Sequence, residues 1–165
     1  MRSLIIILCF AFAISTVFAQ KPKIGIFDSR GVAIAYYQSQ YHQEDLKKLM
    51  LEYNEAKDAG DTIKAAKLSD RVAILQMIAH DKGFGKGTVN NILDKFTKEL
   101  DELAKKENLS CIVSKWEIYS ADNDIKFVDV TEKVVAIINP NEKVKIFLEQ
   151  LKNNPPIEDA FFIED

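Results

Sequence analysis

Apolar residues recur at spacings of three, four and seven through the centre of the chain. One series lies between residues 30 and 57, and a second lies between residues 62 and 79. Such spacing is typical of helices that pack along one seam, as in coiled coils. The two series are Ala35, His42, Leu46, Leu49, Tyr53 and Ala56, followed by Ala65, Leu68, Val72, Leu75 and Ala79.

The short stretch between the two series predicts a turn. Gly60 suits the end of one helix, and Asp61 suits the beginning of the next. Two helices joined so closely pack antiparallel. We therefore predict a helical hairpin, here called the arm, with its tip at residues 59–61. The side chains expected to pack between its helices are Leu46, Leu49, Tyr53, Leu68, Val72 and Leu75.

A glycine cluster interrupts the second helix. Three glycines within five residues would destabilise a helix interior by about 3 kcal/mol. The apolar spacing nevertheless continues in phase beyond them. We therefore predict one long helix over 62–107 with a kink or hinge, and a separate third helix from Thr88 is the alternative. The candidate hinge consists of Gly83, Phe84, Gly85 and Gly87.

Short strand-like segments lie on either side of the arm. Residues 23–28 begin with alternating apolar and polar positions, which predicts a first strand. Residues 109–114 and 116–120 predict two further strands, and residues 126–130 are also extended in character. The segments that flank the arm should then meet in one small sheet.

Two amphipathic segments follow the last strand-like segment. They predict short helices over residues 130–138 and 142–152. The expected fold class is therefore α+β. It consists of a small sheet of N- and C-terminal strands joined by a long, coiled-coil-like helical hairpin, with short helices at the C-terminus.

The first 19 residues are typical of a secretory signal peptide. Arg2 precedes an apolar run over residues 4–17, and small side chains then fit a cleavage site before Gln20. No later segment reaches the roughly 20 apolar residues that a membrane span needs. We expect a chain secreted across the inner membrane into the periplasm, with a single domain over residues 20–152 and a flexible tail over 153–165.

The charge and cysteine content narrow the possibilities. A formal net charge of −3 and an isoelectric point near 5.5 argue against nucleic acid, which needs a basic surface. Cleavage of the signal peptide leaves Cys111 as the one cysteine, so the mature chain has no internal disulfide. We expect Cys111 to be a buried structural residue, and we expect core packing or oligomerisation to supply the stability.

A polar triplet, Asp28, Ser29 and Arg30, follows the first predicted strand. A strand-to-helix turn of this kind can bind an anion or another polar ligand. Aspartate and serine are also preferred residues at helix N-termini. We favour this simpler interpretation, in which the triplet caps a helix and Arg30 lies in solvent.

The sequence contains no catalytic, cofactor-binding or metal-binding signature. The glycine cluster lacks the preceding strand and the Lys-Ser/Thr ending of a phosphate-binding loop. His42 and His80 lie 16 and 19 residues from the predicted turn at residues 58–61, so they could approach each other. No cysteine or carboxylate spacing supports a metal site there. We therefore predict no enzyme activity and no cofactor, and we expect both histidines to be packed or at the surface.

This order of segments resembles the Skp/OmpH family of periplasmic chaperones. The opening KIGIFDSRGVAIAYY (residues 23–37) lies where that family has its first strand and helix, and residues 59–61 look like its arm tip. The closest local similarity is CIVSKWEIYSADNDIKFVDVTEKVV (residues 111–135). This segment resembles the family's closing strands, polar turn and last helix. The similar layout extends over residues 23–138.

The resemblance implies an ATP-independent holdase that binds unfolded envelope and outer-membrane proteins with its helical arms. It also implies a homotrimer with a small, barrel-like body. The family has no catalytic residues, and its client contacts are spread over the arm surface. No single residue of this chain therefore inherits a role from the family.

Three features depart from the family pattern. Well-studied members are strongly basic, whereas residues 42–107 here contain 12 Lys and Arg against 13 Asp and Glu. This balance weakens the expectation of attraction to acidic clients or anionic lipid. The first arm helix is also short, and the glycine cluster and the tail after Asn139 are not features of the family.

Two other functions stay open at this point. One alternative is a secreted structural or interaction protein that oligomerises through its helices. The other alternative is a small-ligand binder or an enzyme near Asp28 and Arg30. That function requires the glycine cluster to fold back against the end of the first strand.

Overall fold

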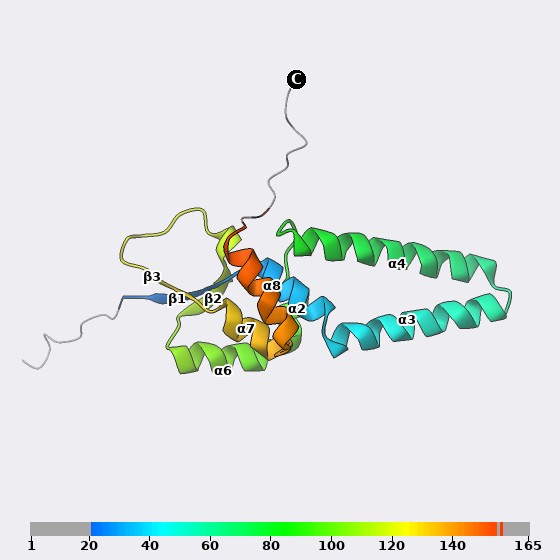
Figure 1. Ribbon diagram of the computed structural model, residues 1–165, viewed down its shortest axis with the longest axis horizontal. Helices are drawn as coiled ribbons and strands as arrows, with labels where there is room; N and C mark the ends of the chain where they lie inside the picture. Colours follow the sequence, from blue (N-terminus) through cyan, green and yellow to red (C-terminus); the bar gives the residue numbers. More distant parts are fainter. Residues whose placement is uncertain (1–20, 155, 157–165) are drawn as a thin grey trace, which may run out of the picture.

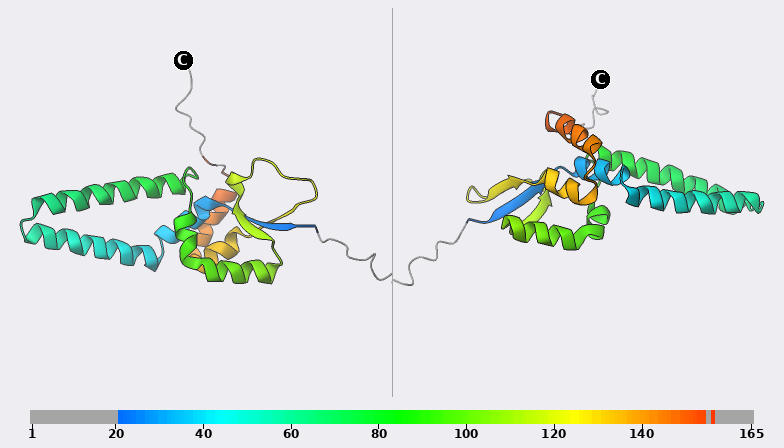
Figure 2. Two further views of the ribbon diagram at one scale, coloured as in Figure 1. Left: turned by 180° about the vertical axis from the view of Figure 1, so that it is seen from behind. Right: turned by 60° about the horizontal axis from the view of Figure 1, so that its bottom comes forward.

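The computed structural model describes residues 21–154 and residue 156. The predicted signal peptide over residues 1–19, and most of the predicted tail, lie outside these residues. The described chain has an α+β fold, as predicted. A small sheet and several helices form a body, and a helical hairpin projects from it (Figures 1 and 2).

The sheet has three parallel strands. β1 (Lys23–Phe27) lies in the middle, between β2 (Cys111–Ser114) and β3 (Lys126–Asp129). The predicted strands at 23–28 and 109–114 and the extended segment at 126–130 are therefore confirmed. The segments before and after the arm do meet in one sheet.

The predicted strand over 116–120 is wrong. Residues Lys115–Glu117 form a short 3₁₀ helix, labelled η2. The Ser114 hydroxyl accepts a hydrogen bond from the Trp116 backbone N–H at 3.4 Å, and this local cap turns the chain out of the sheet. Residues 116–120 have a strand-like composition, but the hydrogen bond between Ser114 and Trp116 favours the 3₁₀ turn instead.

The two faces of the sheet have different surroundings. A Cβ atom added to Gly25 would lie 2.8 Å from Leu109 Cδ1 and 3.1 Å from Val130 Cγ2, so this face packs on the body. Side chains alternate along a strand, which places the neighbours of Gly25 on the opposite face. The strand register extends this outer face across the sheet. Its residues are Ile24, Ile26, Cys111, Val113, Phe127 and Asp129, of which Asp129 is charged and exposed.

Cys111 is exposed rather than buried, so the expectation of a buried structural cysteine is wrong. The reason is its position at the start of an edge strand, on the outer face. Phe127, on the other edge strand, is 38% exposed. A parallel sheet normally has both faces covered, and here the outer face is covered only in part.

The first predicted helix, over 30–57, is in fact two helices. α2 (Ser29–Tyr37) belongs to the body, and α3 (Gln40–Asp58) belongs to the arm. Ser39 separates them, because its hydroxyl donates to the Tyr36 carbonyl at 2.6 Å and accepts from the His42 N–H at 3.4 Å. One side chain thus ends a helix and begins the next. The seven-residue gap in the apolar spacing coincides with this break.

The glycine cluster ends the second arm helix instead of kinking it. α4 (Thr62–Gly83) stops there, and Gly85 adopts a φ of 82°, which favours glycine. The chain then re-enters the body through α5 (Asn90–Leu93), η1 (Asp94–Phe96) and α6 (Thr97–Glu107). The prediction of one helix over 62–107 is wrong, and the alternative of a separate helical segment after Thr88 is closer.

The apolar residues beyond the glycines pack in the body, not along the arm. Val89, Phe96 and Leu103 all belong to the main core. The apolar spacing continues beyond the glycines because these side chains are buried in the core of the body, not because the arm helix continues. With α4 ending at Gly83, the two arm helices have 19 and 22 residues, or roughly 29 and 33 Å. The hairpin is therefore nearly symmetric.

The seam of the arm is closed near its tip and open near the body. Leu49, Ala56 and Leu68 are buried in a second small core, with Tyr53, Ala65 and Val72 packed against it. Leu46 and Leu75 are 40% and 43% exposed, so their predicted packing is wrong. The reason is that α3 and α4 diverge toward the body, as the views in Figures 1 and 2 show.

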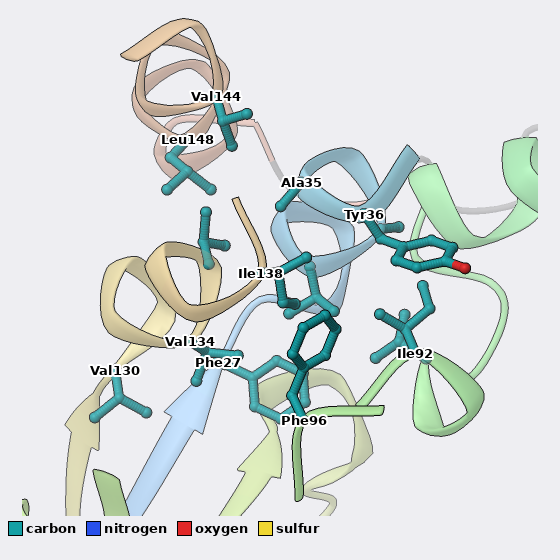
Figure 3. Close-up of a cluster of buried hydrophobic side chains, with 14 of the residues drawn as sticks. Phe27, Ala35, Tyr36, Ile92, Phe96, Val130, Val134, Ile138, Val144 and Leu148 are labelled. Atoms are coloured by element: carbon teal, nitrogen blue, oxygen red, sulfur yellow. The ribbon is translucent and has the colours of Figure 1, made fainter. Parts of the chain in front are cut away.

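The main core surrounds α2. This helix contacts α4, α7 (Thr131–Ile138) and α8 (Glu142–Lys152), which confirms the two predicted C-terminal helices. Figure 3 shows side chains from the strand, from α2 and from the C-terminal helices pointing into one cluster. Its labelled members are Phe27, Ala35, Tyr36, Ile92, Phe96, Val130, Val134, Ile138, Val144 and Leu148.

Two isoleucines of very different burial provide a test of this core. Ile92 is fully buried, whereas Ile63 on the arm is 70% exposed. We expect Ile92→Ala to lower the free energy of unfolding by about 2–5 kcal/mol, because it removes packed methylene groups and leaves a cavity. The matched change Ile63→Ala should lower it by about 0.5 kcal/mol or less. Urea unfolding followed by circular dichroism measures both, and equal losses would contradict the assigned core.

Candidate functional site

The polar triplet lies at the junction between β1 and α2. The Asp28 carboxylate caps α2, since its Oδ1 accepts a hydrogen bond from the Arg30 backbone N–H at 3.0 Å. Ser29 is buried in the first turn. The predicted role of the triplet as a helix cap is therefore confirmed.

The expectation that Arg30 lies in solvent is wrong. Its side chain folds back onto the cap and is almost completely buried. Nε donates to Asp28 Oδ1 at 3.0 Å, and Nη2 donates to Asp28 Oδ2 at 2.7 Å. Two parallel hydrogen bonds between a guanidinium group and a carboxylate form a strong, geometrically specific pair.

Residues after β2 complete the surroundings of this pair. Trp116 Nε1 donates to Asp28 Oδ1 at 3.1 Å, and Lys115 Nζ lies 2.9 Å from Asp28 Oδ2. The Arg30 guanidinium carbon is 5.1 Å from the centre of the Trp116 ring, which is within cation–π range. The Asp28 backbone N–H donates to Thr131 Oγ1 at 3.0 Å. The Asp28 carboxylate thus binds groups of α2 and η2, and the Asp28 backbone binds α7.

The same arginine also holds the end of the described chain. Nη1 donates a hydrogen bond to the Asn154 carbonyl at 2.7 Å, and Nη2 donates one to the Leu151 carbonyl at 3.3 Å. The second residue of the predicted flexible tail over 153–165, Asn154, is therefore bound to the body. The rest of the predicted tail, residues 155 and 157–165, lies outside the described residues.

The glycine cluster does fold back against the end of β1. A Cβ atom added to Gly85 would lie 3.3 Å from Arg30 Cγ, so this glycine packs directly on the arginine stem. The geometric requirement of the ligand-binding alternative is met. The space between the two elements is nevertheless filled by the arginine side chain itself, which makes the contact one of packing.

The candidate hinge is a packed turn. A Cβ atom added to Gly87 would lie 3.1 Å from Lys82 Cγ, and Lys82 Nζ donates to Asn91 Oδ1. The loop therefore wraps the buried stem of Lys82. Two hinge residues differ from this: a Cβ atom added to Gly83 would meet no atom within 4 Å, and Phe84 is 46% exposed.

A cleft of about 320 Å³ lies beside the Asp28 carboxylate. Asp28, Lys115 and Thr131 form one side of its lining, and Leu148 and Leu151 of α8 contribute apolar groups. Two further lysines at the cleft are already paired: Lys133 Nζ lies 2.7 Å from Glu107, and Lys152 Nζ lies 2.9 Å from Glu132. Asp129, which also lines the cleft, accepts a hydrogen bond from the Thr131 backbone N–H at 2.8 Å. The charged side chains of the cleft therefore have ion-pair or hydrogen-bond partners within the chain.

The chemistry of this region is that of a satisfied ion-pair network. In residues 21–154 and 156, no buried side-chain nitrogen or oxygen lacks a hydrogen-bond partner. The same residues contain no group of three histidine, cysteine or acidic side chains that could hold a metal ion. The network is built to join segments of the chain.

The two histidines lie on either side of Tyr37 without meeting at a metal site. The His42 and Tyr37 rings are edge to face, with centroids 4.9 Å apart. Burial lowers the pKa of His42, although Asp45 opposes this shift. His80 is exposed, and its ring centroid is 6.1 Å from that of Phe84. Both positions agree with the expectation of packed or surface-exposed histidines.

The network around Asp28 sets the protonation of its carboxyl group. Burial would raise the pKa of Asp28, but hydrogen bonds from Arg30, Lys115 and Trp116 outweigh it. The resulting pKa is about 2, below the ordinary value of 3.8. The carboxylate is therefore ionised throughout the physiological range.

The chain was compared with family models, curated proteins and solved structures, and none of them matches it. The resemblance to the Skp/OmpH family thus stands on the layout and segments of the sequence. Within residues 21–154 and 156, the helices are all too short or too polar to cross a membrane.

Sequence reasoning missed two features of functional interest. One is the part played by Lys115 and Trp116, which lie 87 and 88 residues from Asp28 in the sequence. No periodic pattern signals such a distant contact. The other is the large number of exposed apolar side chains on the arm. The sequence does contain a signal for these exposed side chains, because apolar residues such as Met50, Ile74 and Met77 lie outside the seam positions.

The low pKa of Asp28 predicts a loss of stability in acid. Because the folded-state pKa is about 2 and the ordinary value is 3.8, the stabilisation is fully present above about pH 4. It is lost as the pH falls toward 2, and it amounts to roughly 2 kcal/mol. Asp28→Asn should remove this pH dependence and destabilise the chain at pH 7, because it removes the counter-charge of buried Arg30.

Urea unfolding between pH 2 and pH 7 measures the effect. Asp124→Asn is the matched control, because the Asp124 side chain is 73% exposed and its loss should leave the pH profile nearly unchanged. If Asp28→Asn does not fold, an NMR titration of the Asp28 carboxyl carbon in the unsubstituted chain still gives the pKa. A midpoint at 3.8 or above would show that the network does not stabilise the carboxylate.

Proposed function

We propose that this protein is an ATP-independent holdase of the periplasm that binds unfolded envelope and outer-membrane proteins through its arm. The observation that carries the proposal is the apolar surface of α3 and α4. Nine large apolar side chains of the arm are between 37% and 70% exposed. They are Tyr41, Leu46, Met50, Leu51, Ile63, Ile74, Leu75, Met77 and Ile78.

Apolar side chains gathered on an exposed element are typical of interaction surfaces. Leu46 and Leu75 support this proposal most directly, because they belong to the predicted seam and are nevertheless 40% and 43% exposed. An extended apolar segment of a client would find side chains there that the arm does not use for its own packing. Methionines such as Met50 and Met77 adapt to partners of varied shape.

Charge has a small part in this proposed mechanism. Residues 40–83, which form the arm, contain seven basic and eight acidic side chains, so the arm offers no strong field to attract a client of either sign. Capture would rest on the burial of apolar area, which gains about 25 cal/mol per Å². It would involve no chemical step.

Oligomerisation, with a trimer favoured, is the second part of the proposal. The outer face of the sheet supports it, since Ile24, Ile26, Val113 and Phe127 leave an apolar surface only partly covered by the described chain. Parallel sheets are almost always covered on both faces. Copies of the chain that meet on this face would supply the cover and would set several arms around one space.

An aggregation assay tests the holdase activity. We expect the mature protein, from Gln20 onward, to suppress the light scattering of a diluted, unfolded outer-membrane protein at a stoichiometric ratio. The double variant Leu46→Ser, Leu75→Ser should lose at least about half of the suppression, because it removes apolar area that clients bury. The matched control replaces Ile146 and Phe147 of α8, which are 61% and 40% exposed, by serine, and it should retain the activity.

If neither the unsubstituted chain nor the control variant suppresses aggregation, the proposal is contradicted. A stable oligomer that binds one folded partner and fails this assay would indicate the alternative, a structural or interaction protein. Equal losses in the arm variant and in the control variant would show that the arm has no special role.

The solution mass of the mature chain tests the oligomer. Light scattering on a size-exclusion column should give three times the mass of one chain. Phe127→Lys should shift the protein toward a monomer, because it places a charge on the outer face, whereas Ile146→Lys on α8 should not. A monomeric unsubstituted chain would contradict this part of the proposal and leave the arm to act alone.

A further inference from the structure

A shallow groove lies between α2 and the base of α4. It has a volume of about 310 Å³, and its lining contains no aspartate, glutamate, lysine or arginine. The lining residues are Ile34, Tyr37, Gln38, Ala79, His80, Gly83 and Phe84. Phe84 is 46% exposed. An apolar groove beside an exposed phenylalanine can accept another apolar side chain.

The path of the chain brings one segment to this groove. Arg30 holds the carbonyls of Leu151 and Asn154, which fixes the chain as it leaves α8. Pro156 Cβ lies 3.4 Å from the position of a Cβ atom added to Gly85. Gly85 follows Phe84, which lines the groove, so the last described residue lies close to the groove. Figure 1 shows the described chain ending beside the loop that follows α4.

The composition of residues 157–165 fits this destination. The sequence IEDAFFIED places three large apolar residues together, Phe161, Phe162 and Ile163, between acidic pairs. Phe161 is five residues beyond Pro156, so an extended chain could carry it up to about 17 Å. The acidic pairs on either side can stay in water while the aromatic side chains enter an uncharged site.

We propose that residues 157–165 of the same chain dock in this groove, with Phe161 or Phe162 as the anchoring side chain. The attachment at Arg30 makes docking an intramolecular step. A short tether gives an effective concentration in the millimolar range, so even a weak apolar contact is populated. Docking covers Phe84 and does not depend on the holdase activity proposed above.

Disulfide trapping in the full mature chain tests the docking. The parent variant carries Cys111→Ser, and Gln38→Cys with Ala160→Cys then places one thiol at the groove and one beside the anchor. Under a mild oxidant we expect the intramolecular disulfide to form about tenfold faster than in the matched control, which pairs Asp81→Cys with Ala160→Cys. Asp81 is exposed and adjoins His80 in sequence, but it does not line the groove.

A second comparison shows whether the aromatic side chains direct the contact. Adding Phe161→Ser and Phe162→Ser to the Gln38 and Ala160 pair should lower its rate to that of the Asp81 control. Equal rates at residues 38 and 81, or a rate that survives the loss of both phenylalanines, would overturn the proposal. A disulfide that joins two chains on a non-reducing gel would assign the segment to the groove of another copy and would also overturn it.

Discussion

The buried ion pair between Asp28 and Arg30 is the interaction on which the arrangement of this chain depends. It joins the end of β1, the start of α2, the turn after β2 and the exit of α8 through hydrogen bonds of 2.7–3.3 Å. A buried ion pair contributes modestly to stability, but the loss of one partner leaves an uncompensated charge in the interior. Its main effect is therefore to specify which segments meet.

This constraint also shapes the arm. The pair fixes α2 in the body, and the two arm helices then connect to the body at different points. α3 leaves through the Ser39 break, and α4 returns through the glycine turn that packs on Arg30. Because these points are separate, the helices diverge and the lower part of their seam stays open. The exposed apolar surface of the arm, which we propose binds clients, is thus a consequence of how the body holds the arm.

Local signals explain which predictions succeeded. The strands at 23–28 and 109–114, the arm turn and the last two helices follow from apolar periodicity and from capping residues, which act within a few positions of each other. The predictions failed where a specific contact decided the outcome. Ser39 divided a helix through two hydrogen bonds, and the glycine turn ended another, although the apolar spacing ran on without change of phase.

The sequence by itself determined the α+β class, the helical hairpin and the cap at Asp28, because periodicity, propensity and capping are local properties. Only the tertiary structure decided that Arg30 is buried, that Cys111 is exposed and that Leu46 and Leu75 are left outside the seam. Each of these outcomes depends on groups distant along the chain. The exposure of a side chain is a property of the surfaces that meet around it, and those surfaces exist only when the chain has folded.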